Sequence, residues 1–304
     1  MTDRGKVDQA FFDRHIYPRL GADREDVALG PKHGVDFGVV EVGGEAVVLA
    51  SDPLSLVPAL GFERAAWFAV HVALSDAAVS GVPPSHLAVT FTLPPEMTDD
   101  QFRTTALAVG DPDEVVRPDG ARPGDRLLVT KGPAVEVAGF LVPLFEDAID
   151  LPEETVATAK ERFYDMSPVK DALTAAAAGP VTAMHDATEG GLRGALVELA
   201  RAGGVRLDVD SEAVPVLPGV EASCEYFEID PWAATSEGTL LATVAPSGVE
   251  DVLSALAAED IPAAEIGEVT AGTGAYVDGE RVTPPETDPS WAVFEEYAEK
   301  VGVE

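Results

Sequence analysis

The stretch His185-Asp186-Ala187-Thr188-Glu189-Gly190-Gly191-Leu192 decides the fold of this chain of 304 residues. An apolar run at 181–184 precedes it, and apolar residues at helical spacing follow it over 188–202, which predicts a strand, a turn and a helix. Asp186 or Thr188 can cap this helix, and the two glycines allow a ligand to approach the backbone N–H groups. The pattern fits either an ordinary capped helix or a helix start that binds a phosphate.

The rest of the second half alternates strands and helices. A strand is predicted at 126–130, and a strand, helix and strand follow at 239–244, 249–258 and 264–269. The dipeptide Asp278-Gly279 predicts a closing hairpin, because this pair favours a two-residue turn.

The first half shows the same mixture. The β-branched runs on either side of Gly43-Gly44 predict a hairpin over 39–50. Apolar residues at helical spacing predict a helix from Trp67 to Ala78, which stops before Gly81-Val82-Pro83-Pro84. A strand is expected at 86–93. Alternating strands and helices in both halves predict an α/β (α+β) protein of mixed layers.

A division into two domains is expected from the length of the chain. The stretch 111–125 is rich in proline, glycine and charge, and so is the best candidate for a boundary. We therefore predict an N-terminal domain at 1–120 and a C-terminal domain at 121–304.

The net charge is the strongest signal of composition. Asp and Glu number 54 against 20 Lys and Arg, which gives −34. Such a surface repels phosphate backbones, so we expect no binding of nucleic acid. Self-repulsion of this size is screened within about 3 Å at 1 M salt, which indicates a halophilic protein. The same bias makes any single carboxylate weak evidence of a site.

The absence of targeting segments and the low cysteine content predict an ordinary intracellular protein. We find no apolar run of about 18 residues and no signal-peptide pattern after Met1, so a cytoplasmic protein without membrane association is expected. Cys224 is the single cysteine, which leaves no disulfide framework and no thiolate metal cluster.

Three acids lie at predicted element ends or on an apolar helix face. Asp36 lies in a glycine-flanked loop, Asp52 follows the second hairpin strand, and Asp76 lies on the helix among alanines and a leucine. Carboxylate oxygens of this kind suit Mg²⁺. The alternative is chance, because a chain this acidic places some carboxylates at element ends.

Two further places attract attention for other reasons. Ser236-Glu237-Gly238 precedes a strand and fits either a turn or a site. Lys131 is a scarce lysine at a strand end, where a surface position is the ordinary reading.

These segments together resemble a known superfamily. The run 184–192 is followed in order by Glu198-Leu199-Ala200, Val214-Pro215-Val216, Ser236-Glu237-Gly238-Thr239-Leu240 and Ile266-Gly267-Glu268-Val269. This collinear set is similar to the two-domain, PurM-like superfamily related to aminoimidazole-ribonucleotide (AIR) synthase, and within it to the hydrogenase-maturation proteins called HypE. A looser match covers Asp36, Ser51-Asp52 and Leu74–Gly81.

The resemblance implies an N-terminal domain that dimerises through its sheet and a C-terminal α/β domain that closes over the site. It implies ATP and Mg²⁺ as cofactors, a small-molecule substrate and a maturation-protein partner. Metal and phosphates would lie near Asp36, Asp52 and Asp76. The cofactor site would also draw on residues from the second half: Lys131, Asp186, Glu189, Gly190, Gly191, Ser236, Glu237 and Gly238.

The chain departs from the HypE pattern in two respects. Those proteins end in a cysteine, whereas this sequence ends in Val301-Gly302-Val303-Glu304. A strand–helix unit that the superfamily places before the boundary is absent where Gln101–Gly110 runs into it. The resemblance therefore allows three functions. These are a HypE-like or AIR synthase-like activation of an oxygen, a small-molecule kinase of the thiamine-monophosphate kinase type, and a non-catalytic nucleotide-binding member.

Overall fold

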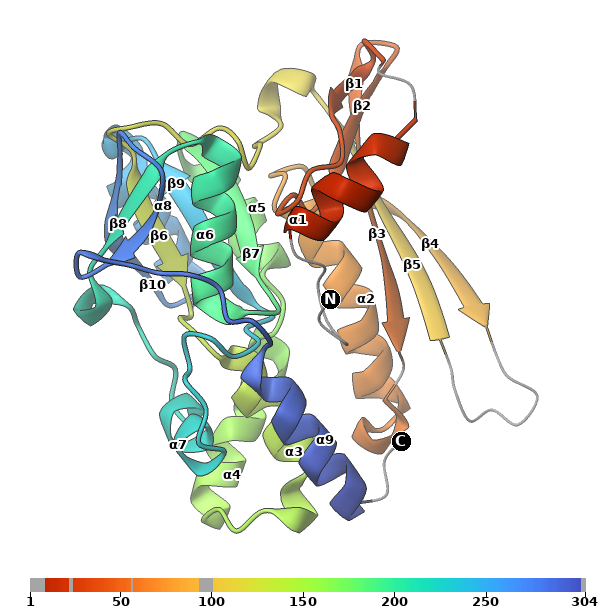
Figure 1. Ribbon diagram of the computed structural model, residues 1–304, viewed down its shortest axis with the longest axis vertical. Coiled ribbons are helices and arrows are strands. Elements are labelled where there is room, and N and C mark those ends of the chain that lie inside the picture. The colour runs from red at the N-terminus through yellow and green to blue at the C-terminus, as the bar shows by residue number, and fades with distance from the viewer. Residues whose placement is uncertain (1–8, 22–23, 56, 93–100, 302–304) are drawn as a thin grey trace.

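Two β-sheets and the helices packed on and below them make up the protein (Figure 1). The computed structural model describes residues 9–21, 24–55, 57–92 and 101–301. The α/β class predicted from the alternation of strands and helices is confirmed. Within the described ranges, no helix combines the length and the apolar character needed to cross a bilayer.

The first sheet has five antiparallel strands in the order β1-β2-β3-β5-β4. Their bounds are β1 Val27–Leu29, β2 Gly38–Val42, β3 Glu45–Ser55, β4 Pro84–Thr92 and β5 Gln101–Gly110. The predicted hairpin is confirmed as β2 and β3, with Val42 paired to Glu45. Gly43 and Gly44 make its turn at φ of 64° and 91°, a backbone region that glycine enters without steric cost.

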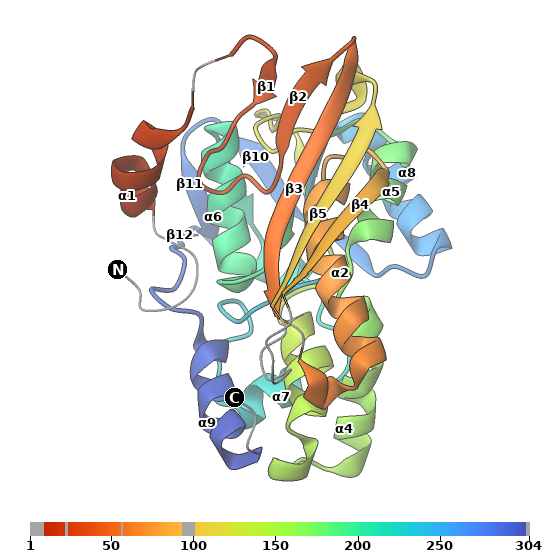
Figure 2. The same cartoon turned by 90° about the vertical axis from the view of Figure 1, so that its right-hand side faces the viewer.

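Helix α2 (Phe62–Ala78) covers one face of this sheet, and no helix lies over the strands on the side that faces the viewer in Figure 2. The helix predicted at 67–78 is confirmed and starts five residues earlier. It ends before Gly81, whose φ of 76° is incompatible with further helical turns.

The second sheet has seven strands in the order β12-β11-β8-β10-β6-β9-β7. They are β6 Arg126–Thr130, β7 Val181–Ala187, β8 Arg206–Val209, β9 Thr239–Val244, β10 Ala263–Thr270, β11 Gly274–Val277 and β12 Glu280–Arg281. All neighbours are antiparallel except β11 and β8. The strands predicted at 126–130 and 239–244 are confirmed to the residue, as is the hairpin at Asp278-Gly279.

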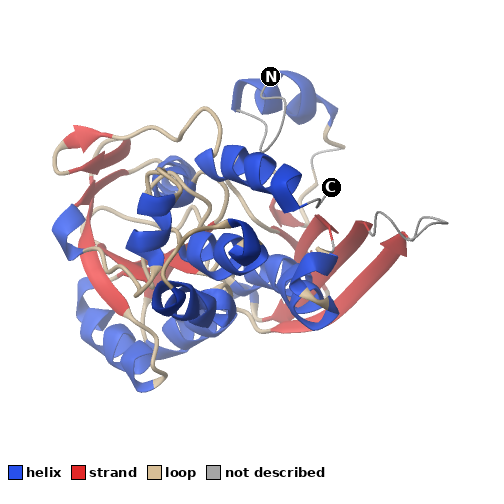
Figure 3. Ribbon diagram, turned by 90° about the horizontal axis from the view of Figure 1, so that it is seen from below, coloured by secondary structure: helices blue, strands red, loops and turns tan. Residues whose placement is uncertain are grey.

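Helices pack on both faces of the second sheet and gather at one end of the molecule (Figure 3). Helix α6 lies on one face, and α5 and α8 lie on the other. The helix predicted at 249–258 is confirmed as α8. The remaining bounds are α1 Gln9–Phe11, α3 Val142–Leu144, α4 Glu153–Lys160, α5 Val169–Ala178, α6 Gly191–Gly203, α7 Val220–Tyr226, α8 Val249–Ala258 and α9 Pro289–Val301.

One apolar cluster joins the two sheets. It includes Val48 of β3 and Ala77 of α2 from the first half, and Met184 of β7 and Leu256 of α8 from the second, all at most 1% exposed. The division between 120 and 121 falls in the connection between the sheets and stays a prediction. The two units that it separates share this part of their core.

Three predicted element ends need correction. Strand β3 continues to Ser55, so Asp52 lies within the strand instead of ending it. Strand β7 continues past Met184 to Ala187, because the chain keeps pairing with β9 as far as Ala187 and Thr239. Helix α6 begins only at Gly191, since Gly190 takes a left-handed conformation at φ 82°. Strand β4 covers the strand predicted at 86–93, whose last residue lies outside the described ranges.

Strand β5 occupies the stretch where the superfamily pattern predicts a further strand–helix unit. It pairs with β3 on one side and with β4 on the other. The pairing with β3 runs from Ser55 opposite Gln101 to Ala46 opposite Gly110. Only residues 93–100 connect it to β4. The short connection agrees with the departure noted in the sequence.

Candidate functional site

Five acids from the two halves of the chain meet between the sheets, and we call them the acidic cluster: Asp36, Asp52, Asp76, Asp186 and Glu237. They come from the loop before β2, strand β3, helix α2, strand β7 and the loop before β9. All five were predicted as site residues. The structure brings them together although up to 201 positions separate them in the sequence (237 − 36).

Electrostatic repulsion within the cluster is severe. Burial raises the pKa of Asp76 well above its usual value, and Asp186, Asp52 and Asp36 raise it further. Burial also raises the pKa of Glu237, to which Asp186 adds the next largest effect. Asp186 and Glu237 are 2% and 3% exposed, so water does little to screen them. The cluster without a cation is therefore a source of instability.

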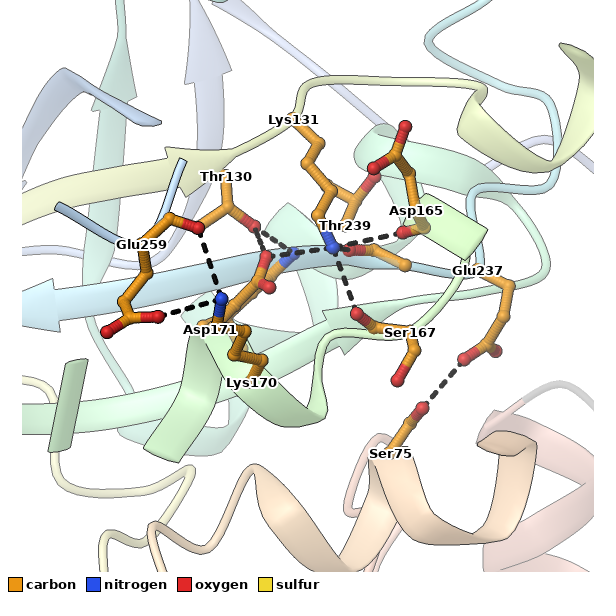
Figure 4. Close-up of polar contacts among 12 residues, drawn as sticks. Ser75, Thr130, Lys131, Asp165, Ser167, Lys170, Asp171, Glu237, Thr239 and Glu259 are labelled. Carbon is orange, nitrogen blue, oxygen red and sulfur yellow. Dashed lines mark hydrogen bonds and ion pairs between the residues drawn. The ribbon is translucent and has the colours of Figure 1, made fainter. Parts of the chain in front are cut away.

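Polar neighbours fix the orientation of Glu237. The hydroxyl of Ser75, on α2, donates to its Oε1 at 2.9 Å, which links the two halves (Figure 4). On the other side, Glu136 Oε2 accepts the backbone N–H of Glu237 at 3.2 Å and the hydroxyl of Thr235. Burial raises the pKa of Glu136 to about 7, against the lowering effect of these two hydrogen bonds.

The donor set of the cluster fits Mg²⁺. Asp52 Oδ2 is buried and has no hydrogen-bond partner among the residues that the structure describes, which is costly for a carboxylate oxygen. Hard carboxylate oxygens are the protein ligands that Mg²⁺ prefers, usually one or two of them with phosphate oxygens and water. Asp36, Asp52 and Asp76 offer such oxygens from the first half of the chain.

His185 is close to the cluster but is not available as a metal ligand. One oxygen of Asp36, one of Asp186 and a ring nitrogen of His185 lie within 4.8 Å of one another. Nδ1 lies 2.6 Å from Asp36 Oδ2, however, and Nε2 lies 3.0 Å from Glu198 Oε2. Both nitrogens therefore donate protons to carboxylates, which makes the ring an imidazolium. Burial opposes this charge, yet Asp36 and then Glu198 outweigh it and raise the pKa of His185 to about 10.

The start of α6 is fixed by the protein itself. The N–H of Gly190 donates to Asp288 Oδ2 at 2.7 Å, that of Gly191 to Thr188 O at 3.1 Å, and that of Arg193 to Trp232 O at 2.9 Å. These three N–H groups are therefore occupied by acceptors of the protein and do not bind a phosphate in this structure. Neither Asp186 nor Thr188 caps the helix, whose N-cap is Gly190 without a side-chain bond.

Close packing explains Gly191 and Gly238 better than ligand access does, whereas Gly190 is favoured by its φ of 82°. A Cβ at Gly191 would lie 2.4 Å from Ala234 O, and one at Gly238 would lie 2.2 Å from Asp165 O. Glu189 is engaged within the protein instead of with a nucleotide, because its Oε1 accepts the indole N–H of Trp291 at 2.7 Å.

Lys131 is buried behind the turn at 236–238. Its ammonium donates to the carbonyls of Asp165 and Ser167 at 2.9 Å each and lies 3.1 Å from Asp171 Oδ2 (Figure 4). These acceptors use its three protons, so none remains for a phosphate. Gly238 O lies 3.3 Å from the same nitrogen, which places Lys131 as a support of the turn that carries Glu237.

Ser236 also supports this turn. Its side chain is fully buried, and Oγ accepts the backbone N–H of Ala134 at 2.7 Å. Of the predicted residues in the second half, Asp186 and Glu237 thus belong to the acidic cluster, whereas the others hold the chain around it.

Residues 122–280 match the family described as AIR synthase related protein, C-terminal domain. This match covers more than half of the chain. The chain belongs to the AIR synthase-related family. The superfamily predicted from the run at 184–192 and the collinear segments after it is thereby confirmed.

Relatives in the AIR synthase-related family agree with this assignment. A carbamoyl dehydratase HypE from Rhizobium leguminosarum bv. viciae is 27% identical over 284 residues, which cover 80% of this chain and 79% of the relative. The solved structure of AaThiL complexed with AMPPCP and TMP has a TM-score of 0.67 at 20% identity, over 83% of this chain and 89% of that one.

Two HypE structures are similar as well. A HypE in complex with ATP has a TM-score of 0.64 at 20% identity and covers 92% of both chains. A HypE–HypF complex has a TM-score of 0.63 at 20% identity, over 82% of this chain and 92% of that one. At this identity the likeness shows the fold of the AIR synthase-related family and leaves the ligands of this chain open.

Four functional neighbours were not assigned from the sequence: His185, Glu198, Glu136 and Asp288. His185 lay in the quoted run without a role, and no local pattern marks Glu198 or Glu136. Asp288 did carry a signal, since an acid directly before Pro289 is typical of an N-cap followed by proline at the first helical position.

Proposed function

We propose that the chain is an ATP- and Mg²⁺-dependent enzyme that activates an oxygen of a small substrate by phosphorylation. The acidic cluster carries this proposal, because five carboxylates meet there and one buried oxygen of Asp52 has no hydrogen-bond partner in the described part of the chain. Removing one partner from a buried charged group is strongly destabilising, so such a cluster requires cations. Divalent metal ions, which nucleotide phosphates also bind, supply them.

The residues divide the task between the halves of the chain. Asp36, Asp52 and Asp76 would hold the metal, and Asp186 and Glu237 face it from the C-terminal half. Bound there, Mg²⁺ would neutralise charge on the phosphates. The chain itself then has mainly to position groups, which Ser75 does for Glu237 through the hydrogen bond between the halves.

The similar structures support a nucleotide as the ligand. One is a HypE in complex with ATP, and another is AaThiL complexed with AMPPCP and TMP. The carbamoyl dehydratase relatives support the activation of an oxygen that leaves as phosphate. The AaThiL likeness supports the alternative, a small-molecule kinase, for which the same cluster would serve.

Calorimetric titration of the chain with Mg-ATP tests the proposal, in about 2 M KCl so that the acidic surface is screened. We expect saturable binding that requires Mg²⁺, and a marked loss in Asp52→Ala. Asp147→Asn is the matched control, since Asp147 is exposed and remote in sequence from the cluster. Absence of Mg-dependent binding by the wild type would refute the proposal.

Analysis of the products separates the possible reactions. Incubation with ATP and candidate acceptors gives a phosphorylated product if the chain is a kinase. Free phosphate without such a product identifies a dehydratase or cyclase reaction. Binding without turnover identifies a non-catalytic member.

We also propose that the chain forms a homodimer through the first sheet. Among the described residues, the face opposite α2 has no helix over it in Figure 2, and it bears the side chain of Leu49, which is 37% exposed. Exposed apolar side chains on a sheet face are typical of an interaction surface. Sedimentation of Leu49→Lys against the wild type tests this, with a monomeric wild type as the contrary result. The similar HypE–HypF complex supports a maturation protein as a further partner.

A further inference from the structure

The loop that carries Asp36 is held by a chain of three side chains in hydrogen-bond contact. His185, on β7, is 1% exposed and lies between Asp36 at 2.6 Å and Glu198 of α6 at 3.0 Å. Hydrogen bonds in which both partners are ionised are shorter and about twice as strong as neutral ones. The chain of contacts therefore runs from α6, through a strand of the second sheet, to a carboxylate of the first half.

Two further contacts join the same loop to the same turn of α6. A Cβ at Gly34 would lie 3.1 Å from Cβ of Glu198, closer than most such contacts, and the φ of 75° at Gly34 also favours glycine. Arg201 Nη1 donates to Nδ1 of His33 at 3.0 Å. Glu198 and Arg201 are three residues apart and so lie on one face of the helix. The loop from His33 to Asp36 is thus docked on α6 at several adjacent residues.

This arrangement is an expensive way to join two segments. Burying charged groups costs desolvation that their attraction barely recovers, and apolar residues of similar volume would often stabilise the fold as well or better. What these hydrogen bonds provide is a fixed orientation of the side chains. A double acceptor set on the imidazolium fixes the ring, and the ring fixes Oδ2 and hence the plane of the Asp36 carboxylate.

We propose that Glu198 and His185 are positioning residues, which orient Asp36 for the metal that the acidic cluster binds. This inference rests on the proposed function, since it takes Asp36 as a metal ligand. Hydrogen-bond partners behind a metal ligand are typically worth about 10- to 100-fold in metal affinity. Glu198, which contacts His185 on the ring nitrogen opposite the one that faces Asp36, is the residue to change.

The experiment measures Mg-ATP affinity in four variants: Glu198→Ala, Glu198→Gln, Asp36→Asn and the double variant Asp36→Asn/Glu198→Ala. We expect Glu198→Ala to weaken binding about 10- to 100-fold. Glu198→Gln keeps an acceptor for Nε2 but loses the charge, so its loss should be smaller, and it serves if the alanine variant does not fold. Exposed Glu225→Gln is the control and should bind as the wild type does.

The double variant distinguishes positioning from a general loss of structure. If Glu198 acts through Asp36, adding Glu198→Ala to Asp36→Asn changes affinity by no more than about twofold. An equal loss in both backgrounds overturns the positioning role, as does wild-type affinity in Glu198→Ala and Glu198→Gln. A wild type that binds no Mg-ATP overturns the proposed function first and this inference with it, so the two failures are distinguishable.

Discussion

Replacing Asp76 by asparagine should stabilise the metal-free protein. Burial and then Asp186, Asp52 and Asp36 all raise the pKa of Asp76 above its usual 3.8. A carboxyl group whose pKa is raised by folding destabilises the folded state as pH rises above the unfolded value, by up to about 1.4 kcal/mol per pH unit. Between 3.8 and pH 7 this amounts to at most about 4.5 kcal/mol (1.4 × 3.2). Neighbouring acids share the same protons, so we expect a gain of about 1–3 kcal/mol.

Urea unfolding with EDTA at pH 4.5 and pH 7 measures this gain. About 1 M KCl shortens the screening length to about 3 Å and so suppresses the surface charges while leaving the buried ones. The gain of Asp76→Asn should be small at pH 4.5 and full at pH 7, and exposed Asp147→Asn should show neither. Saturating Mg²⁺ should make the wild type the more stable of the two proteins. The wild type keeps its metal ligand, and binding at 100 times the Kd stabilises it by about 2.7 kcal/mol. A gain that is absent, or equal at both pH values, would refute the reasoning.

Three other substitutions test the supports of the site. Lys131→Met leaves Asp171 buried without its cation and should cost about 3–5 kcal/mol in urea unfolding, whereas a cost below about 1 kcal/mol would show that the pair is dispensable. Gly191→Ala forces a Cβ to 2.4 Å from a carbonyl oxygen and should lower the free energy of unfolding by more than about 2 kcal/mol. Gly279→Ala is the control, because Gly279 has a similar positive φ but open space around it, and it should cost about 1 kcal/mol. Equal costs would contradict the packing argument. Asp288→Ala removes the N-cap of α9 and the acceptor of a buried N–H, for a loss of about 2–4 kcal/mol, and hydrogen exchange should rise at both helix starts; unchanged exchange at the start of α6 would contradict the link.

Local signals predicted the elements whose ends depend on nearby residues. The Gly43-Gly44 turn and the strand at 126–130 are examples, because turn geometry and a run of apolar residues suffice to place them. The end of β7 could not be placed in this way. Asp186 looked like a turn residue, but its strand continues since it pairs with Leu240, far along the chain.

The acids of the site were predicted better than their surroundings. Asp36, Asp52 and Asp76 came from element ends and from the family resemblance, and the structure brings them together. The helix start at Gly190 was misjudged because the carboxylate that accepts its N–H belongs to Asp288, 98 residues later. The pairing of His185 with Asp36 spans 149 residues, and neither periodicity nor motif spacing reports on such a contact.

The apolar cluster shared by the two sheets has a consequence for the history and engineering of the protein. Val48 and Ala77 on one side pack into the same core as Met184 and Leu256 on the other. Exchange of one half for that of a relative would therefore also replace half of a common core. Since well-packed cores tolerate changes of volume poorly, a working chimera must carry matched versions of α2 and of α5 and α8. Selection thus acts on the two halves as a pair.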